Sequence, residues 1–248
     1  MRALTATELL AAWEQSLGQP PTQRAVTLLA PVCTGVSRDA LARLPVGRRD
    51  ACLLALREHT FGPRLASLTE CPRCRQNIEL EFDVADVRVV SEDEPDDGAS
   101  PITLRDGQHE VTFRLPNSLD LADAAAAGDP ADARRRLLER CVMSARDAGG
   151  LEIPVGDLTE NLVAAVAVAM AEADPQADVQ LALVCPHCGH EWTAPFDIAG
   201  FVLAELEATV QRLLREVHEL AAAYGWPETY ILSLSPARRH AYLELLRA

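Results

Sequence analysis

Cys71-Pro72-Arg73-Cys74 and Cys185-Pro186-His187-Cys188 are two copies of one motif in widely separated parts of the chain. The match extends past the cysteines, because Phe82-Asp83-Val84-Ala85 follows the first copy at the spacing at which Phe196-Asp197-Ile198-Ala199 follows the second. Short apolar stretches that flank each copy favour a β-hairpin with the cysteines at its tip. The repeat therefore predicts two hairpins that come together although they lie far apart in the sequence.

The spacing of the cysteines predicts a metal site. One Cys-x-x-Cys motif supplies two thiolates, whereas a closed structural zinc site requires four ligands in a tetrahedron. The two copies together supply four, so we predict one structural zinc ion per chain, bound by Cys71, Cys74, Cys185 and Cys188. Two alternatives stay open, a degenerate site without metal and a redox-active pair, although a redox pair normally lies between a strand and a helix.

The sequence around the two Cys-x-x-Cys hairpins, here called knuckles, is mostly helical in pattern. The predicted fold class is therefore α+β and mainly helical, a split four-cysteine zinc ribbon with an inserted helical region and helical N- and C-terminal extensions. Within the insertion, Asp129-Pro130 is expected to open a helix that runs to about Ala145. The predicted regions are residues 1–63 (N-terminal helices), 64–115 (first knuckle and a β-hairpin, with an acidic connector over 91–100), 116–178 (helical insertion), 179–200 (second knuckle) and 201–248 (C-terminal helical arm).

The C-terminal arm begins with a long apolar seam. Apolar residues recur three and four positions apart from Leu203 to Tyr224, which is a heptad pattern. The seam either covers the protein's own core or pairs with a partner helix, in which case the chain forms an oligomer through residues 203–224. The pattern is short for an independent coiled coil.

Aromatic and arginine side chains gather after the seam. Such residues commonly dominate protein–protein interfaces, so residues 225–248 are predicted to form a docking surface. The alternative is that the rings fold back onto the long helix. The candidate partner-binding residues are Trp226, Tyr230, Arg238, Arg239 and Tyr242.

Composition and motifs narrow the class of function. The formal net charge is −14, so a phosphate backbone is repelled on average and nucleic-acid binding is not expected. The sequence has no glycine-rich phosphate loop, no Gly-x-Ser-x-Gly and no His-Glu-x-x-His. A zinc ion closed in by four thiolates has no open position at which to activate water. We therefore predict that the protein is not an enzyme. No apolar run is long enough to span a bilayer, no secretory signal is expected, and the cysteine usage favours a reducing compartment such as the cytoplasm.

Several further stretches together carry a resemblance to a known family. They are Leu44-Pro45-Val46-Gly47-Arg48-Arg49-Asp50, Phe61-Gly62-Pro63-Arg64-Leu65, the block Phe196 to Ala199 with Leu214 to Leu220, and the ending Tyr224-Gly225-Trp226-Pro227-Glu228 with Ile231 to Arg239. The chain resembles baseplate proteins of phage-tail-like contractile injection systems, which are distantly similar to hub and hub-assembly proteins of T-even phages.

The resemblance implies a structural or assembly role in a contractile tail. Other baseplate or tail proteins would then be the partners, and a chain made in the cytoplasm would be incorporated into a phage-tail-like particle. An alternative from a different class is a zinc-ribbon regulatory protein that acts on nucleic acid or on the transcription machinery, and the negative charge speaks against it.

Overall fold

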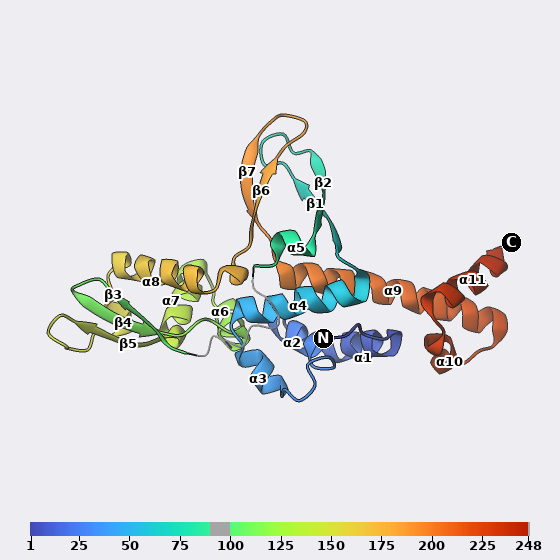
Figure 1. The fold of residues 1–248 in the computed structure, drawn as a ribbon, viewed down its shortest axis with the longest axis horizontal. Helices are drawn as coiled ribbons and strands as arrows, with labels where there is room; N and C mark the ends of the chain where they lie inside the picture. Colours follow the sequence, from blue (N-terminus) through green and yellow to red (C-terminus); the bar gives the residue numbers. More distant parts are fainter. Residues whose placement is uncertain (90–99, 248) are drawn as a thin grey trace.

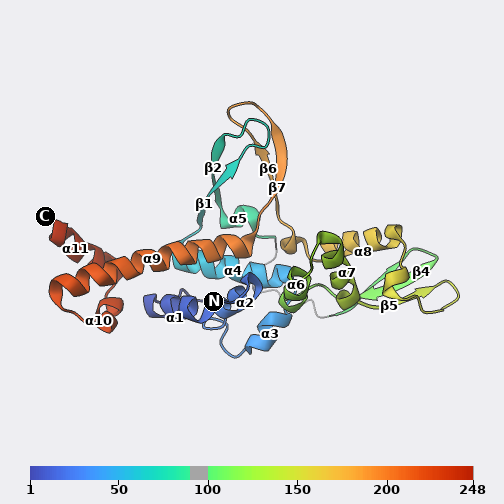
Figure 2. The same ribbon diagram turned by 180° about the vertical axis from the view of Figure 1, so that it is seen from behind.

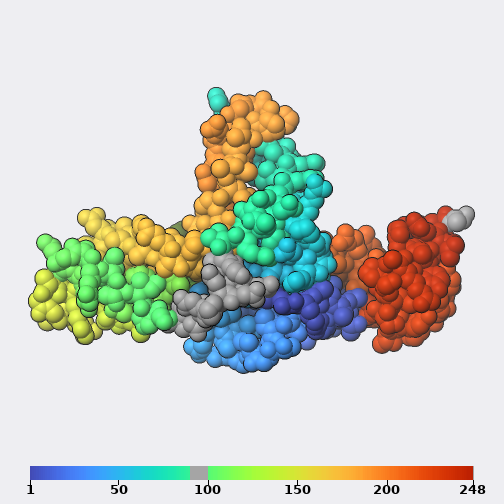
Figure 3. Space-filling view, viewed as in Figure 1, coloured from blue at the N-terminus to red at the C-terminus, as the bar shows by residue number. Residues whose placement is uncertain are grey.

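Helices packed along one axis carry a pair of β-hairpins that stands away from them as a prong (Figure 1). The computed structural model describes residues 1–89 and 100–247. The acidic connector predicted over 91–100 therefore lies, except for Ser100, outside the described residues. Seen from behind and in space-filling view, the prong, the insertion and the C-terminal arm extend in three different directions (Figures 2 and 3).

The chain begins with helices whose starts are fixed by local signals. The first has a capping box, in which Thr5 accepts a hydrogen bond from the Glu8 backbone and the Glu8 side chain accepts one from the Thr5 backbone. The longest helix of this group ends at Gly62, whose φ of +92° is accessible to glycine at little cost. The helices are α1 (Ala6–Ser16), α2 (Pro21–Leu29), α3 (Arg38–Arg43) and α4 (Val46–Phe61).

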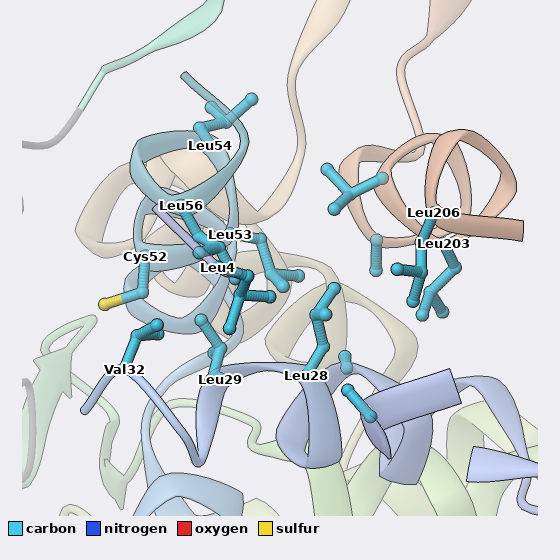
Figure 4. Packing of buried hydrophobic residues seen from close by; sticks show 14 of the residues in the cluster. Leu4, Leu28, Leu29, Val32, Cys52, Leu53, Leu54, Leu56, Leu203 and Leu206 are labelled. Atoms are coloured by element: carbon cyan, nitrogen blue, oxygen red, sulfur yellow. The ribbon is translucent and has the colours of Figure 1, made fainter. Parts of the chain in front are cut away.

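The main core forms where these helices pack against the long helix α9 (Ile198–Tyr224). Leu203 and Leu206 of α9 face Leu28 of α2 and Leu53 of α4 in the interior (Figure 4). The seam positions from Leu203 to Leu220 are all buried by the chain's own side chains. The expectation of an oligomer through the 203–224 seam is therefore corrected, because burial inside one chain leaves this face unavailable to a second copy.

The prong consists of the two predicted hairpins. Strands β1 (Arg64–Glu70) and β2 (Asn77–Asp83) pair antiparallel, and so do β6 (Gln180–Val184) and β7 (Glu191–Pro195). At the base of the prong, a short helix α5 (Val84–Val87) follows β2, and the rings of Phe82 and Phe196 meet edge to face with centroids 5.4 Å apart. The repeated Phe-Asp motif thus holds the two hairpins together where they join the body.

The insertion contributes one strand, β5, that the helical prediction for residues 116–178 did not include. Strands β3 (Ile102–Arg105) and β4 (His109–Phe113) form the predicted hairpin, and β4 also pairs with β5 (Val142–Asp147). The helix expected to reach Ala145 is wrong at its end, because α7 (Pro130–Cys141) stops before this strand. Pairing with β4 buries Val142 and Ala145 against Val111 and Phe113. The free energy gained from this burial outweighs the preference of the local sequence for a helix. The remaining elements are α6 (Ser118–Ala125), η1 (Val155–Asp157), α8 (Glu160–Ala173) and η2 (Pro175–Ala177).

The C-terminal arm has a small core of its own. Beyond the left-handed C-cap Gly225, α10 (Glu228–Ser233) and α11 (Pro236–Arg247) fold back on the end of α9. Leu232 of α10 packs against both this small core and the main core. The buried residues of the small core come from all three helices: Val217, Leu220, Ile231 and Leu243.

A buried polar junction joins α4 to the end of the insertion. The backbone N–H of Gly47 donates to Oδ2 of Asp174 at 2.9 Å, and Asp174 is buried. Beside it, Arg49 forms an ion pair with Asp50 at 2.7 Å and donates to Ser118 Oγ at 3.2 Å. Burial raises the pKa of Asp50 to about 6, although Arg49 acts in the opposite direction. The junction fixes the insertion to the helical body.

Gly47 leaves no room for a side chain at this junction. A Cβ there would lie 1.8 Å from Asp174 Oδ1 and 2.8 Å from the backbone nitrogen of Ala177. We expect Gly47→Ala to lower the free energy of unfolding by about 3 kcal/mol, because Asp174 must give up its hydrogen bond and the backbone must move. For a chain of this size this corresponds to a fall in Tm of roughly 6–12 °C in a calorimetric scan.

The matched control for this variant is Gly156→Ala. A Cβ at this exposed position meets no atom within 4 Å, so its Tm should stay close to that of the wild type. Equal melting temperatures for the two variants would show that the close approach of Asp174 is not a structural constraint.

Candidate metal centre

Both knuckles turn in the same way at the tips of the hairpins. In the first, Cys71 N–H donates to the Gln76 carbonyl at 2.9 Å and Arg75 N–H to the Cys71 carbonyl at 2.9 Å. The second repeats this pattern, with Cys185 donating to His190 at 2.8 Å and Gly189 to Cys185 at 2.9 Å. The sequence repeat is therefore also a repeat of backbone structure.

The residue after each second cysteine takes the left-handed conformation. Gly189 has a φ of +67° and Arg75, at the equivalent position, a φ of +63°. Glycine adopts this conformation freely, whereas a residue with a Cβ does so at a cost of about 1 kcal/mol. Arg75 is the only residue other than glycine with positive φ in the part of the chain that the structure describes. Only the alignment with Gly189 could have revealed this from the sequence.

The four cysteines meet between the two knuckles. Their Sγ atoms all lie within 4.8 Å of one another, with 3.8 Å between Cys71 and Cys188 and 3.6 Å between Cys74 and Cys185. These separations are far too long for a disulfide bond. They match the edge of about 3.8 Å expected for a tetrahedron of sulfurs around zinc, where Zn–S is about 2.3 Å. The structure thus brings together all four predicted ligands in a geometry that fits a metal ion.

The protonation of the thiols depends on the same geometry. Burial opposes ionisation of Cys71, but the backbone N–H groups of Cys74 and Arg73 outweigh it and lower the pKa of Cys71 to about 7. At Cys74 the backbone N–H of Gln76 favours the thiolate, yet burial and the neighbouring thiols prevail and raise the pKa to about 12. A bound cation would therefore favour the thiolate form of Cys74, against the effects of burial and of the neighbouring thiols.

An apolar shell surrounds the sulfurs. Cys71 and Cys185 are fully buried, and Ile78, Leu80 and Trp192 pack against them. His190 stacks on Trp192 with ring centroids 5.9 Å apart and does not belong to the group of possible ligand atoms. The site therefore has two buried thiols beside an apolar cluster, whereas Cys74 is half-buried and Cys188 is exposed. Four thiols in this arrangement suit a structural metal centre.

Comparison with known families gives a match over most of the chain. The family described as T4 bacteriophage base plate protein matches residues 5–202. The chain belongs to this family. The resemblance inferred from the sequence is confirmed, and membership supports a structural role in a phage baseplate, together with other baseplate or tail proteins. Both knuckles lie inside the match, whereas most of α9 and the helices that follow it lie beyond its end.

Comparisons with curated proteins and with solved structures gave no match. Within residues 1–89 and 100–247, no helix has the length and apolar character needed to cross a bilayer.

The aromatic residues predicted for docking lie together at the end of this baseplate protein's arm. The ring centroid of Trp226 is 4.9 Å from that of Tyr242 and 5.4 Å from that of Tyr230. Tyr224 stacks on Trp226 at 4.6 Å, so the rings do pack against the long helix. They remain partly accessible, and Tyr230 is 42% exposed.

The two predicted arginines of the arm have different environments. Arg238 is exposed, with its guanidinium carbon 5.7 Å from the centroid of Tyr242. Arg239 is buried and donates to Glu216 Oε2 at 2.9 Å and to the Leu234 carbonyl at 2.7 Å. Arg239 thus stabilises the arm internally, and the accessible candidates are Tyr230 and Arg238, with Trp226 and Tyr242 half-buried.

The arginine triplet of α7 is electrostatically satisfied. Arg134 pairs with Glu160, Arg135 with Asp132 and Glu139, and Arg136 with Asp132. Neighbouring carboxylates therefore pair with each arginine of this triplet, which gives no support to the nucleic-acid alternative.

Proposed function

We propose that the protein is a structural or assembly component of the baseplate of a contractile phage-tail-like particle, built around one structural zinc ion. The observation that carries the proposal is the four-sulfur cluster formed by Cys71, Cys74, Cys185 and Cys188, in a chain of the baseplate family. Their sulfur–sulfur distances suit zinc, and four thiolates would leave it no open coordination position. The role proposed for the ion is mechanical rather than catalytic.

The connections of the prong indicate what the ion would hold in place. Strand β1 follows α4, β6 follows the helical insertion, and β7 leads directly into α9. A zinc ion at the tip would therefore tie the N-terminal helices, the insertion and the long helix to one another. In a particle under load, such a crosslink would keep the N-terminal helices, the insertion and the long helix in a constant relative position.

We further propose that residues 225–248 form a docking surface for another baseplate or tail protein. The support is the accessible ring cluster with Arg238, which combines the residue types that commonly dominate interfaces. This cluster lies at the end of the arm, far from the prong (Figure 1).

Deletion of the gene in the native host tests the proposed function. We expect cells without this protein to produce no complete particles in electron micrographs, and re-expression of the full chain to restore them. Mass spectrometry of purified wild-type particles then separates a permanent subunit, present in the particle, from an assembly factor, absent from it. Normal particles in normal numbers from the deletion strain would contradict both forms of the proposal.

A further inference from the structure

Each hairpin of the prong leaves one strand edge facing a common groove. Within residues 1–89 and 100–247, β2 pairs only with β1, and β6 pairs only with β7. The groove has a volume of about 460 Å³ and is lined by residues of β2, of β6 and of α5 at the base: 79–82, 180–183, Asp86 and Val87. Four consecutive residues of each strand line it, so it follows the strand edges rather than one face of a sheet.

The register shows which backbone groups point into the groove. In an antiparallel pair, hydrogen-bonded and non-hydrogen-bonded residues alternate along each strand, and Cys71 and Gln76 form a hydrogen-bonded pair. The N–H and C=O groups of Ile78, Leu80 and Phe82 therefore point toward β1. Those of Glu79 and Glu81 point away from β1.

The same alternation holds in the second hairpin. Cys185 bonds to His190 and Phe196 to Val179, which places the backbone groups of Leu181 and Leu183 toward β7 and those of Gln180 and Ala182 outward. Within the described part of the chain, no further strand pairs with these outward donors and acceptors, so both strands present them to a segment that enters the groove.

The edge of β6 lacks the features that usually prevent strand addition. The opposite edge, on β7, carries Pro195, which has no N–H, and Glu191. By contrast, the outward positions of β6 are Gln180, Ala182 and Val184, without charge or proline, and Val184 is 61% exposed. Edges of this kind are templates for another strand.

Across the groove, the charge is negative. Glu79, Glu81 and Asp86 all lie along it, and only Glu81 has a cation nearby in the described part of the chain, the exposed Arg64 at 3.5 Å. A segment seated here would gain from arginine or lysine side chains directed toward β2. A second copy of this chain could offer its own β6, but that strand has no cation to place opposite these carboxylates.

We propose that this groove binds an extended segment of a partner protein, which pairs with the open edge of β6 and directs basic side chains at the carboxylates of β2. The backbone pairing would provide most of the affinity, and Leu181 and Leu183 would contact the apolar side chains of the segment. This surface is separate from the ring cluster of the C-terminal arm and does not require the partner to be a baseplate protein.

Site-specific photo-cross-linking in the native host tests the proposal. The full-length protein carries p-benzoylphenylalanine in place of Gln180, at the groove, or in place of Thr193, on the exposed outer strand as a control. We expect the groove position alone to cross-link to a single contiguous segment of another protein, containing arginine or lysine and identified by mass spectrometry.

Two variants test whether the cross-link depends on the charge of the groove and on the open edge of β6. Glu79→Arg/Glu81→Arg removes the negative side of the groove, and Ala182→Pro removes one outward N–H while the bonds of Leu181 and Leu183 to β7 remain. Each should lower the cross-linking yield at least fivefold with unchanged metal content and melting temperature.

Other outcomes overturn the proposal. They are cross-linking to a second copy of this chain, equal yields from the two probe positions, yields unaffected by both variants, or no cross-link at all. Particle formation is scored separately, so loss of this surface is distinguishable from failure of the proposed baseplate role.

Discussion

Replacement of Cys71 and Cys185 by serine is expected to reduce bound zinc from one ion per chain to less than about a tenth, as measured by elemental analysis. Each knuckle would keep one thiolate, and two ligands cannot close a structural zinc site. Because the binding free energy of such sites, about 10–16 kcal/mol in small zinc domains, is also folding energy, the tip of the prong should unfold. Hydrogen exchange of the residues near the tip, 69–80 and 183–192, should become rapid, because they surround the cysteine cluster. The base of the prong, where Leu65, Phe82 and Leu181 belong to the main core, and the buried amides of α4 and α9 should stay protected.

A single variant outside the cluster provides the control. Cys33→Ser changes a half-buried thiol that packs at the main core and does not belong to the four-sulfur group, so zinc content should remain at one per chain. A strong chelator should reproduce the effect of the double variant on the wild-type protein by lowering its thermal midpoint. Wild-type protein purified without zinc, or zinc held at full affinity by the double variant, would refute the assignment.

The four-sulfur cluster shows how much a sequence repeat can determine. The positions of Cys71 and Cys185 within matching motifs predicted that two distant hairpins would meet, and the sulfurs lie within 4.8 Å of one another. The start of α7 could be predicted equally well, because capping by Asp129 is a local interaction and its side chain accepts the expected backbone hydrogen bond from Asp132. Zinc itself remains a prediction.

The parts that the sequence did not reveal depend on contacts between distant residues. The strand over 142–147 carries no strong alternation, and its conformation follows from pairing with β4. Likewise, the heptad pattern of α9 could not show which surface would cover it, since an internal core and a partner helix require the same apolar residues. The approach of Gly47 to Asp174 joins positions far apart in sequence, and no local signal precedes it.

The arm provides the second large effect, the loss of particle assembly on truncation after Tyr224. The truncated protein should remain folded and retain its zinc, because the buried residues of the arm form their own cluster, which touches the main core through the half-buried Leu232 and does not include the cysteine site. The end of α9 should fray, since Val217 and Leu220 lose Ile231 and Leu243 as neighbours. Electron microscopy of the particles, combined with zinc content and a melting curve of the purified protein, measures the outcome.

A surface variant separates docking from packing in the same experiment. Tyr230→Ala/Arg238→Glu changes two exposed side chains and leaves the buried Ile231 and the ion pair of Arg239 with Glu216 intact. The Tm of this variant should lie within about 2 °C of that of the wild type, because substitutions of exposed residues usually change stability little. Particle assembly should nevertheless be lost. If the truncated protein loses its metal or fails to fold, the arm belongs to the core. If either altered protein folds and supports normal particles, residues 225–248 do not dock a partner.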